Sequence, residues 1–374
     1  MSRQHNGITR HVHLSSSLHF DSLGDFVQAG EGAPKLAGQT ARGLDNGYGL
    51  QGNPTCHALQ DAVSQLENGS RSLLYSSGMT ALTALGGLLR SGDHWLLPAG
   101  VYGPMQRYAR YLKERYDISY DMYDPLDPQS LQRLITPHSK LIHIESPCSV
   151  TFETTPIAGV VAIARGHSLL VSADNTWASG VLCKPLDTGV DISILSLTKY
   201  AAGYSDVFMG SVTTRDEQLY KQLAYDHRVH GYTVSPFSAM LVQRGLETLP
   251  TRIIAHARSA ARLLRIVRKS PAVARIFCGG PSATTELKGS NGLFAVELYR
   301  VYSNEELQDI LSGLRVFSIG ESWGGTKSLV LPFQPQDLAD HASSPQGTVL
   351  RFHAGLEDVA AQAADIKNIL HKLD

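Results

Sequence analysis

Short apolar runs alternate with amphipathic segments along the chain from about residue 55 to residue 215. The segment 57–69 places Leu59, Val63 and Leu66 at helical spacing, and Asn68-Gly69 is typical of a helix end. Runs of this helical type are also predicted at 78–93, 103–116 and 157–167, and buried strands at 72–77, 94–99, 140–145, 168–174, 191–197 and 207–212. The alternation predicts βαβ units and a central, mostly parallel sheet covered by helices on both faces.

A second pattern begins near residue 246. Strands are expected at 292–298, 328–333 and 348–354, and helices at 247–270, 304–314 and 357–373. The basic residues of 247–270 fit the solvated face of an amphipathic helix. The first 47 residues are polar and weakly periodic. We therefore predict an extended N-terminal arm (1–47) that packs between subunits, a large α/β domain (48–245) and a smaller C-terminal α/β domain (246–374).

Composition narrows the functional class. The chain has 374 residues, of which 43% are hydrophobic and 18% charged, as in globular proteins. The net charge of −1 gives no general attraction to nucleic acid or to anionic membranes. The N-terminus resembles no signal peptide, and no run approaches the roughly 20 apolar residues of a membrane span. Four scattered cysteines fit free thiols, which predicts a cytoplasmic protein.

Polar and aromatic residues follow four of the predicted strands. Ligands of parallel α/β sheets bind at the carboxyl ends of strands, so these positions are the candidates for chemistry. Taken alone, each of these residues has an ordinary structural explanation. A lysine after a strand is usually solvated, a tyrosine there is usually half-buried, and an aspartate there often caps a turn. The candidates are Gly78, Met79, Tyr102, Asp174, Ser196, Thr198 and Lys199.

Together these residues suit pyridoxal 5'-phosphate (PLP). Backbone amides at a helix start and nearby hydroxyls bind phosphate, which assigns that part to Gly78, Met79, Ser196 and Thr198. A tyrosine ring can stack on the cofactor, and a carboxylate can keep the pyridine nitrogen protonated. A lysine amine can bind the cofactor aldehyde covalently and then act as a base. Tyr102, Asp174 and Lys199 are the residues assigned to these three roles.

The stretch 196–210, SLTKYAAGYSDVFMG, resembles the lysine signature of the Cys/Met-metabolism PLP-dependent enzymes, a fold-type I family of cystathionine β-lyases, γ-lyases and γ-synthases. Further matches in family order cover nearly the whole chain after the arm, and the chain is most similar to the β-lyases. These matches are YGLQGNPT at 48–55, LYSSGMTA at 74–81, ESPCSVTFE at 145–153, ADNTWASG at 173–180, RGLETLPTR at 244–252 and RFHAGLED at 351–358.

The resemblance implies roles for further residues. Tyr48 resembles a catalytic and cofactor-binding tyrosine donated by a neighbouring subunit, which implies a homo-oligomer, a dimer of dimers, with shared active sites. Arg351 resembles the arginine that binds the substrate α-carboxylate as a bidentate pair. Ser322 and Trp323 lie in SWGG, which resembles the substrate-binding loop of β-lyases more than that of γ-lyases. Glu145 and Ser149 fall at pocket positions.

The implied reaction is β-elimination of L-cystathionine, or of a related cysteine S-conjugate, to a thiol (homocysteine), pyruvate and ammonia, a step of transsulfuration and methionine biosynthesis. A γ-elimination or γ-replacement enzyme of the same family is the alternative. Three positions depart from the family pattern. Leu50 replaces a phosphate-binding arginine, Gln51 replaces an arginine that favours a long dicarboxylate substrate, and Tyr204 replaces a histidine.

Two alternatives come from other classes. GESWG at 320–324 matches the serine-hydrolase pattern around Ser322, and Asp337 and His353 follow in the order of a triad. The motif needs a helix after the serine, whereas the following residues read as a strand. A non-catalytic relative that keeps the fold is the second alternative, which the intact Lys199 and Asp174 oppose. No metal site is predicted, because the histidines of HVH at 11–13 have no organised partners.

Overall fold

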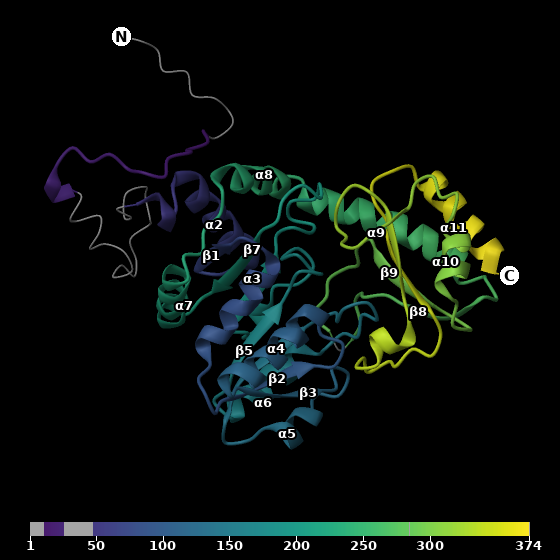
Figure 1. Ribbon diagram of the computed structural model, residues 1–374, viewed down its shortest axis with the longest axis horizontal. Coiled ribbons are helices and arrows are strands. Elements are labelled where there is room, and N and C mark those ends of the chain that lie inside the picture. Colours follow the sequence, from purple (N-terminus) through teal and green to yellow (C-terminus); the bar gives the residue numbers. More distant parts are fainter. Residues whose placement is uncertain (1–10, 26–47, 284, 374) are drawn as a thin grey trace, which may run out of the picture.

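The computed structural model describes residues 11–25, 48–283 and 285–373. It contains two sheets, joined by one long helix that crosses from the large to the small domain (Figure 1). Most of the predicted N-terminal arm lies outside the described residues. Among the described residues, no helix is long and apolar enough to cross a membrane.

The large sheet has seven strands in the order β1-β7-β6-β5-β4-β2-β3. Its strands are β1 (Arg71–Tyr75), β2 (His94–Pro98), β3 (Ser119–Tyr123), β4 (Ser139–Glu145), β5 (Leu170–Asp174), β6 (Ile192–Ser196) and β7 (Gly210–Thr214). The five strands from β3 to β6 pair in parallel, and β7 pairs antiparallel with both β6 and β1. The predicted mostly parallel sheet is confirmed, with β3 as an edge strand that the hydrophobic pattern missed.

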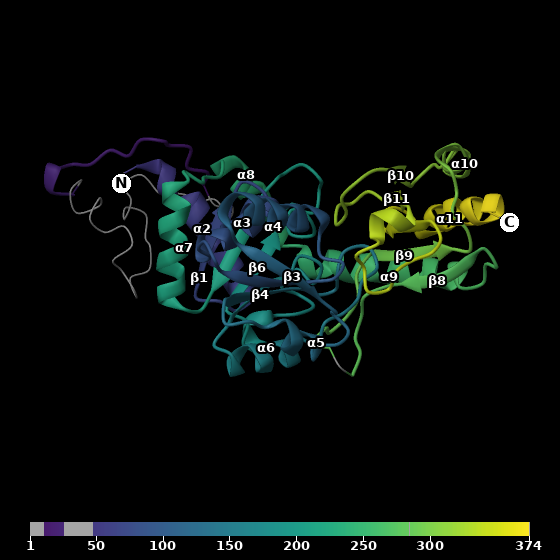
Figure 2. The same cartoon turned by 60° about the horizontal axis from the view of Figure 1, so that its bottom comes forward.

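Helices cover both faces of this sheet (Figure 2). They are α2 (Pro54–Glu67), α3 (Gly78–Thr83), α4 (Gly103–Tyr116), α5 (Ser130–Leu134), α6 (Ile157–Gly166), α7 (Glu217–Val229) and α8 (Pro236–Leu246), with 3-10 turns η1 (Gly49–Gln51), η2 (Ala84–Leu88) and η3 (Pro185–Thr188). Alternate residues of a strand serve opposite faces. Ile194 of β6 packs in the core under α3, α4 and α7, whereas its neighbour Leu195 packs with α2 and α8.

The helix predicted at 78–93 is shorter than expected. It runs as α3 for six residues and then tightens into η2, which ends at Leu88. Gly86 and Gly87 explain the change, because a Cβ at either position would collide with the side chain of Tyr108 or of Asp226. Side chains of α4 and α7 thus contact the backbone of η2 directly. The first residue of α3, Gly78, is one of the candidate site residues.

The small domain is built on a five-stranded sheet in the order β10-β11-β12-β9-β8. Its elements are α9 (Leu249–Val267), β8 (Val273–Phe277), β9 (Leu293–Leu298), α10 (Asn304–Ile310), β10 (Ser318–Ile319), β11 (Leu329–Phe333), η4 (Pro335–Leu338), β12 (Val349–His353) and α11 (Val359–Leu373). Leu263 of α9 and Ile366 of α11 pack against Phe294 and Phe352 of the sheet in one core. Each such buried side chain stabilises the fold by roughly 1.5–3 kcal/mol.

Candidate active site

Three neighbouring strands of the large sheet end at one place. Glu145 at the end of β4 lies beside Asp174 at the end of β5, and Ser196 at the end of β6 lies beside Gly210 of β7. The backbone N–H of Tyr102, in the turn after β2, donates to Glu145 Oε2 at 2.7 Å. The parallel order thus brings four of the predicted positions to one edge, as the sequence led us to expect.

Lys199 lies in the turn after β6 and points to the small domain. Its Nζ donates to Ser322 Oγ at 2.7 Å and lies 5.5 Å from the Trp323 ring centre. Burial lowers the pKa of the Lys199 amine to about 8, and the charge of Arg351 adds to this effect while Asp174 opposes it. A partly buried amine of this kind is a usable base near neutral pH.

The loop that carries Ser322 and Trp323 packs directly on the lysine turn. Gly324 has φ +86°, and a Cβ there would lie 2.9 Å from the Lys199 carbonyl carbon and 2.7 Å from the Tyr200 nitrogen. Glycine is required on both counts, since the left-handed backbone and the close approach each exclude a side chain. Ser322 itself has φ +78°, an uncommon value for a residue with a Cβ.

Arg252 of α9 binds the backbone of the same turn. It is buried, and its Nη2 donates to the carbonyl oxygens of Gly245 at 2.8 Å and Ala201 at 3.3 Å. The Tyr200 hydroxyl accepts from the Gly292 N–H at 3.0 Å, and its ring packs on Trp323 at 5.4 Å between centres. The lysine turn is therefore fixed by groups from both domains.

Asp174 presents a half-buried carboxylate to the same space. Burial raises the pKa of Asp174, while the N–H and hydroxyl of Thr176 and the charge of Lys199 lower it. The N–H of Thr176 donates to Asp174 Oδ1 at 2.9 Å. Beside it, the Asn175 amide donates to Glu67 Oε1 at 3.0 Å and to the Cys183 carbonyl at 3.0 Å. Hydrogen bonds of Thr176 and of the neighbouring Asn175 therefore fix the position of Asp174, which a partner for a protonated ring nitrogen requires.

Two of the positions predicted to bind phosphate lie side by side. Gly78 starts α3 so close to Ser196 that a Cβ on Gly78 would lie 2.5 Å from Ser196 Oγ. Thr198 differs from expectation, because its hydroxyl accepts from the Met209 N–H at 3.0 Å and donates to the Met209 carbonyl at 3.2 Å. These bonds give Thr198 a structural task in the lysine turn.

Tyr102 and Arg351 face the site from the two domains. The Tyr102 side chain is half-exposed at the start of α4, and burial followed by the charge of Glu145 raises its pKa. Arg351 lies in the middle of β12, with its Nη2 donating to the Ser322 carbonyl at 3.3 Å. Burial lowers the pKa of Arg351 to about 10, against the opposing charges of Glu321 and Tyr102.

Glu321 is a residue that sequence reasoning missed. Its side chain is exposed in the loop next to Ser322, and its charge acts on the pKa of Lys199, Arg351 and Tyr102. Glu145, which the sequence placed only at a pocket position, has its pKa raised well above the usual range by burial and then by Asp174. The signal available for Glu321 was its place beside Ser322 in the predicted substrate loop.

Tyr48 and Leu50 are described on the N-terminal side of α2, and both are exposed. The Gly49 N–H between them donates to the Ser16 carbonyl at 2.9 Å, which ties this turn to the arm. The side chain of Gln51 lies outside the described part of the chain. The role predicted for Tyr48 belongs to a neighbouring subunit and stays a prediction.

The hydrolase triad does not assemble. Ser322 Oγ pairs with Lys199, Asp337 Oδ2 accepts from the Gln334 N–H at 2.9 Å, and His353 Nε2 lies 2.9 Å from the Gly325 carbonyl. Burial lowers the pKa of His353 to about 3. The serine is followed by β11, as its sequence predicted, rather than by a helix. No group of three potential metal ligands occurs among the described residues.

Comparisons with known proteins agree with this geometry. The family model of the Cys/Met metabolism PLP-dependent enzymes matches residues 1–371. Cystathionine beta-lyase of Bordetella avium is 33% identical over 96% of this chain and 90% of its own length. An L-alanine/L-glutamate racemase of Wolbachia pipientis is 32% identical over 97% of this chain and 92% of its own length. The structure of cystathionine gamma synthase from Xanthomonas oryzae has a TM-score of 0.86 at 28% identity and covers 100% of this chain and 95% of its own.

The chain belongs to the Cys/Met metabolism PLP-dependent enzyme family. Its cofactor is therefore pyridoxal 5'-phosphate, its fold is fold-type I, and its substrates are small amino acids. The predicted class, a PLP-dependent carbon–sulfur lyase most like the cystathionine β-lyases, is confirmed by curated relatives of about this length.

A first prediction concerns the Lys199 amine in protein freed of PLP. Labelling of Lys199 by trinitrobenzenesulfonate, followed by mass spectrometry across a pH series, should show an inflection near pH 8 rather than near the ordinary value of 10.5. The amine reacts only when deprotonated, so a lowered pKa moves the onset of labelling to lower pH. In Arg351→Leu the inflection should move upward, because a neighbouring positive charge is removed. Wild-type labelling with an inflection above pH 10 would contradict this account.

Proposed function

We propose that this enzyme catalyses β-elimination of L-cystathionine or a related cysteine S-conjugate, which together with one molecule of water yields a thiol, pyruvate and ammonia. From cystathionine the thiol is homocysteine. The observation that carries the proposal is the cluster in which the Ser322 hydroxyl accepts from Lys199 and the Ser322 carbonyl accepts from Arg351, beside Trp323. Curated relatives from several bacteria are cystathionine beta-lyases, which supports the same reaction.

The residues present fit the cofactor. When bound, PLP supplies an aldehyde that captures the substrate amine and a ring that withdraws electrons from the Cα–H bond. Three features match the cofactor. They are the Asp174 carboxylate, the Lys199 amine with its lowered pKa, and the backbone at Gly78, where a Cβ would fill the space beside Ser196. The residues that we propose to hold it are Lys199, Asp174, Tyr102, Gly78, Met79, Ser196 and, from a neighbouring subunit, Tyr48.

The protein groups then divide the work. Arg351 binds the substrate α-carboxylate through its guanidinium. Lys199 removes the α-proton, because burial lowers the pKa of its amine to about 8 and so makes it a usable base near neutral pH, and because Nζ is held by Ser322 Oγ at 2.7 Å. Lys199 or Tyr102 returns a proton to the leaving sulfur. Burial of Lys199 and Arg351 excludes water from the charges that must interact, which strengthens their interaction with the substrate.

The alternative within the family is γ-elimination or γ-replacement. Its support is structural, since a γ-synthase from Xanthomonas oryzae and a γ-lyase from Lactobacillus plantarum both overlay the whole fold, the latter with a TM-score of 0.82 at 26% identity over 97% of this chain and 93% of its own. SWGG, with Trp323 beside Lys199, favours β-elimination.

The product of L-cystathionine tests the assignment. Purified enzyme with added PLP should release pyruvate and homocysteine, which keto-acid identification by mass spectrometry checks. The Lys199→Ala variant should lose turnover by at least about a thousandfold, because the base and the cofactor attachment are both removed. Release of 2-oxobutyrate and cysteine would transfer the enzyme to the γ-lyases. If the enzyme is given L-alanine instead, formation of D-alanine without a keto acid would place the enzyme with the racemases.

A second test addresses the distal end of the substrate. Glu321 adds an exposed carboxylate whose charge acts on Lys199 and Arg351, the two cationic groups of the site, and we expect it to attract the distal ammonium of cystathionine. Glu321→Gln should raise KM for L-cystathionine about two- to fivefold, as loss of an exposed ion pair does, and leave KM for S-methyl-L-cysteine, which lacks that ammonium, unchanged. Glu114→Gln, an exposed control on α4, should change neither. Equal effects on both substrates would contradict this role.

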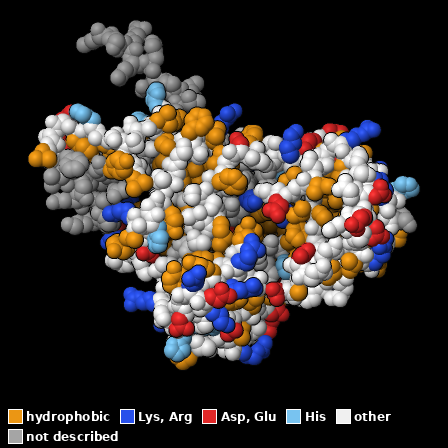
Figure 3. All heavy atoms as spheres, viewed as in Figure 1, with side chains coloured by type: hydrophobic (Ala, Val, Ile, Leu, Met, Phe, Trp, Pro, Cys, Tyr) orange, Lys and Arg blue, Asp and Glu red, His pale blue; other side chains and the backbone are white. Residues whose placement is uncertain are grey.

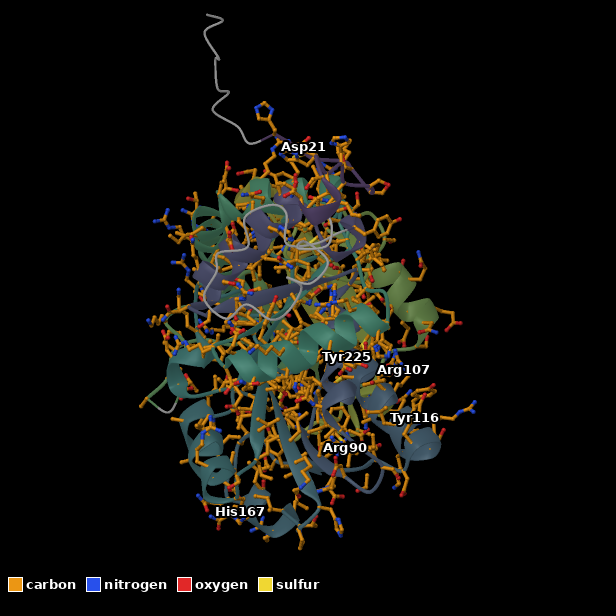
Figure 4. The ribbon with its side chains drawn as sticks, turned by 90° about the vertical axis from the view of Figure 1, so that its left-hand side faces the viewer. Asp21, Arg90, Arg107, Tyr116, His167 and Tyr225 are labelled. Carbon is orange, nitrogen blue, oxygen red and sulfur yellow. The ribbon has the colours of Figure 1, made fainter. Side chains whose placement is uncertain are left out.

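We further propose that the active unit is a homo-oligomer, a dimer of dimers, in the cytoplasm. The four cysteines are free, which supports a reducing compartment. Large apolar side chains stand exposed on the large domain, among them Phe208 at 79% and Tyr225 at 66%. Figure 3 shows hydrophobic side chains over this domain, and Figure 4 shows Tyr116 of α4 and Tyr225 of α7 on one side of it. Such surfaces are typical of subunit contacts.

Complementation between inactive subunits tests the shared site. Lys199→Ala and Tyr48→Ala subunits, mixed one to one and reassembled, should recover about a quarter of wild-type activity, because half of the dimers are mixed and each holds one intact site. Each variant reassembled alone serves as the control and should stay inactive. No recovery, with mixed dimers demonstrated by mass spectrometry, would contradict a site that shares Tyr48 with its neighbour.

A further inference from the structure

A short segment of the small domain is hydrogen-bonded to the large domain near the turn that carries Tyr102. It covers residues 340–344, between η4 and β12. The Gln106 amide of α4 donates to Asp340 Oδ2 at 2.8 Å, and the Ser343 N–H donates to Glu153 Oε1 at 3.0 Å. The Arg275 guanidinium donates to the Ser343 carbonyl at 2.9 Å and fixes the segment to its own sheet. We call residues 340–344 the latch segment.

The centre of this contact is a buried chain of three polar side chains. Thr151 Oγ lies 2.5 Å from Glu153 Oε2 and 2.6 Å from His341 Nδ1, and all three residues are buried. Thr151 has a single hydroxyl proton, and an ionised carboxylate only accepts. The proton of Thr151 therefore points to Glu153, and Thr151 accepts the Nδ1–H of His341. Burial lowers the pKa of His341, against the charges of Glu153 and Asp340, which suits this neutral ring.

The His341 ring also supports the turn that carries Tyr102. Gly100 has φ +82°, and a Cβ there would lie 2.8 Å from His341 Nδ1, so the ring lies directly against the backbone two residues before Tyr102. The Gly100 carbonyl accepts from the Ser149 N–H at 3.1 Å, which joins this turn to the loop that holds Thr151. One imidazole thus contacts both loops at this edge of the large sheet.

The other end of the latch segment leads to the substrate arginine. It continues into β12, which holds Arg351, and the charges of Arg351 and Tyr102 act on each other. We propose that His341, through Thr151 and Gly100, is a positioning residue that fixes the spacing between Tyr102 and Arg351 and so governs substrate binding. The inference rests on the proposed function for the roles of Tyr102 and Arg351, whereas the mechanical link rests on the contacts alone.

Three substitutions separate this role from a general loss of stability. Thr151→Val removes the hydroxyl and keeps the shape, and His341→Leu removes the ring nitrogens. His341→Asn keeps an N–H donor close to the position of Nδ1. The control is Thr213→Val, which deletes a buried hydroxyl that pairs with Ser72 at 2.8 Å within the large sheet. All are studied as PLP-loaded full-length enzyme.

The first readout is amide hydrogen exchange by mass spectrometry over 99–106 and 339–344. Thr151→Val and His341→Leu should speed exchange in both segments by about tenfold, as loss of a buried hydrogen bond allows local opening. His341→Asn should restore most of the protection, and Thr213→Val should leave both segments unchanged. Exchange that rises in only one segment, or equally in the control, would overturn the link.

The second readout is the division between KM and kcat for whichever amino acid the enzyme turns over. Thr151→Val and His341→Leu should raise KM about tenfold while kcat falls less than about threefold, because the lysine turn is untouched. Loss of kcat at constant KM would overturn the positioning role. Faster exchange in an enzyme that does not cleave cystathionine would leave the link intact and refute the proposed reaction instead.

Discussion

Contact between the Gly324 backbone and the Lys199 backbone is the constraint on which the site depends. It brings a loop of the small domain against a turn of the large domain at the one residue that must be both covalently reactive and basic. Ser322 can reach the Lys199 amine at 2.7 Å only because no side chain separates the two backbones. The same contact places Trp323 and Arg351 beside the amine, so the pKa of Lys199 is a property of the docked pair of domains.

The electrostatics of the site follow from this docking. Burial lowers the pKa of both Lys199 and Arg351. The charges of Asp174 and Glu321 oppose this shift at Lys199, and the charge of Glu321 opposes it at Arg351. Arranging opposite charges around a partly dry space keeps the site stable while leaving one amine easily deprotonated. An amine in open solvent would hold its proton, and an amine buried without carboxylates would destabilise the fold.

Much of the site was predictable because its residues follow strands or sit in recognisable short motifs. Lys199 and Asp174 come to one edge by the parallel order of the sheet, which the sequence shows through its alternating pattern. Gly78 reaches the same edge because β1 and β6 both pair antiparallel with β7 and so run in the same direction. Thr198 shows the limit of this reasoning. Its place beside Lys199 in the sequence predicts a hydroxyl that is free to bind phosphate, whereas in the structure this hydroxyl is hydrogen-bonded to the backbone of Met209. Glu321 and His341 were missed because their roles depend on how two domains meet, which no local pattern records. The domain boundaries at 47 and 245 likewise stay predictions.

Helix α9 has a consequence for how this fold can vary. It is a single helix of 19 residues, about 28 Å long, which begins beside the lysine turn, where Arg252 grips Ala201 and Gly245, and ends under the outer sheet with α11. The first end of α9 therefore contacts the turn that carries Lys199, whereas the other end contacts only the core of the small domain. Loops at the far end, near β8 and α10, can lengthen or change sequence with little mechanical effect at the lysine. The small domain thus offers an outer rim where new contacts can be acquired while the reacting geometry is kept.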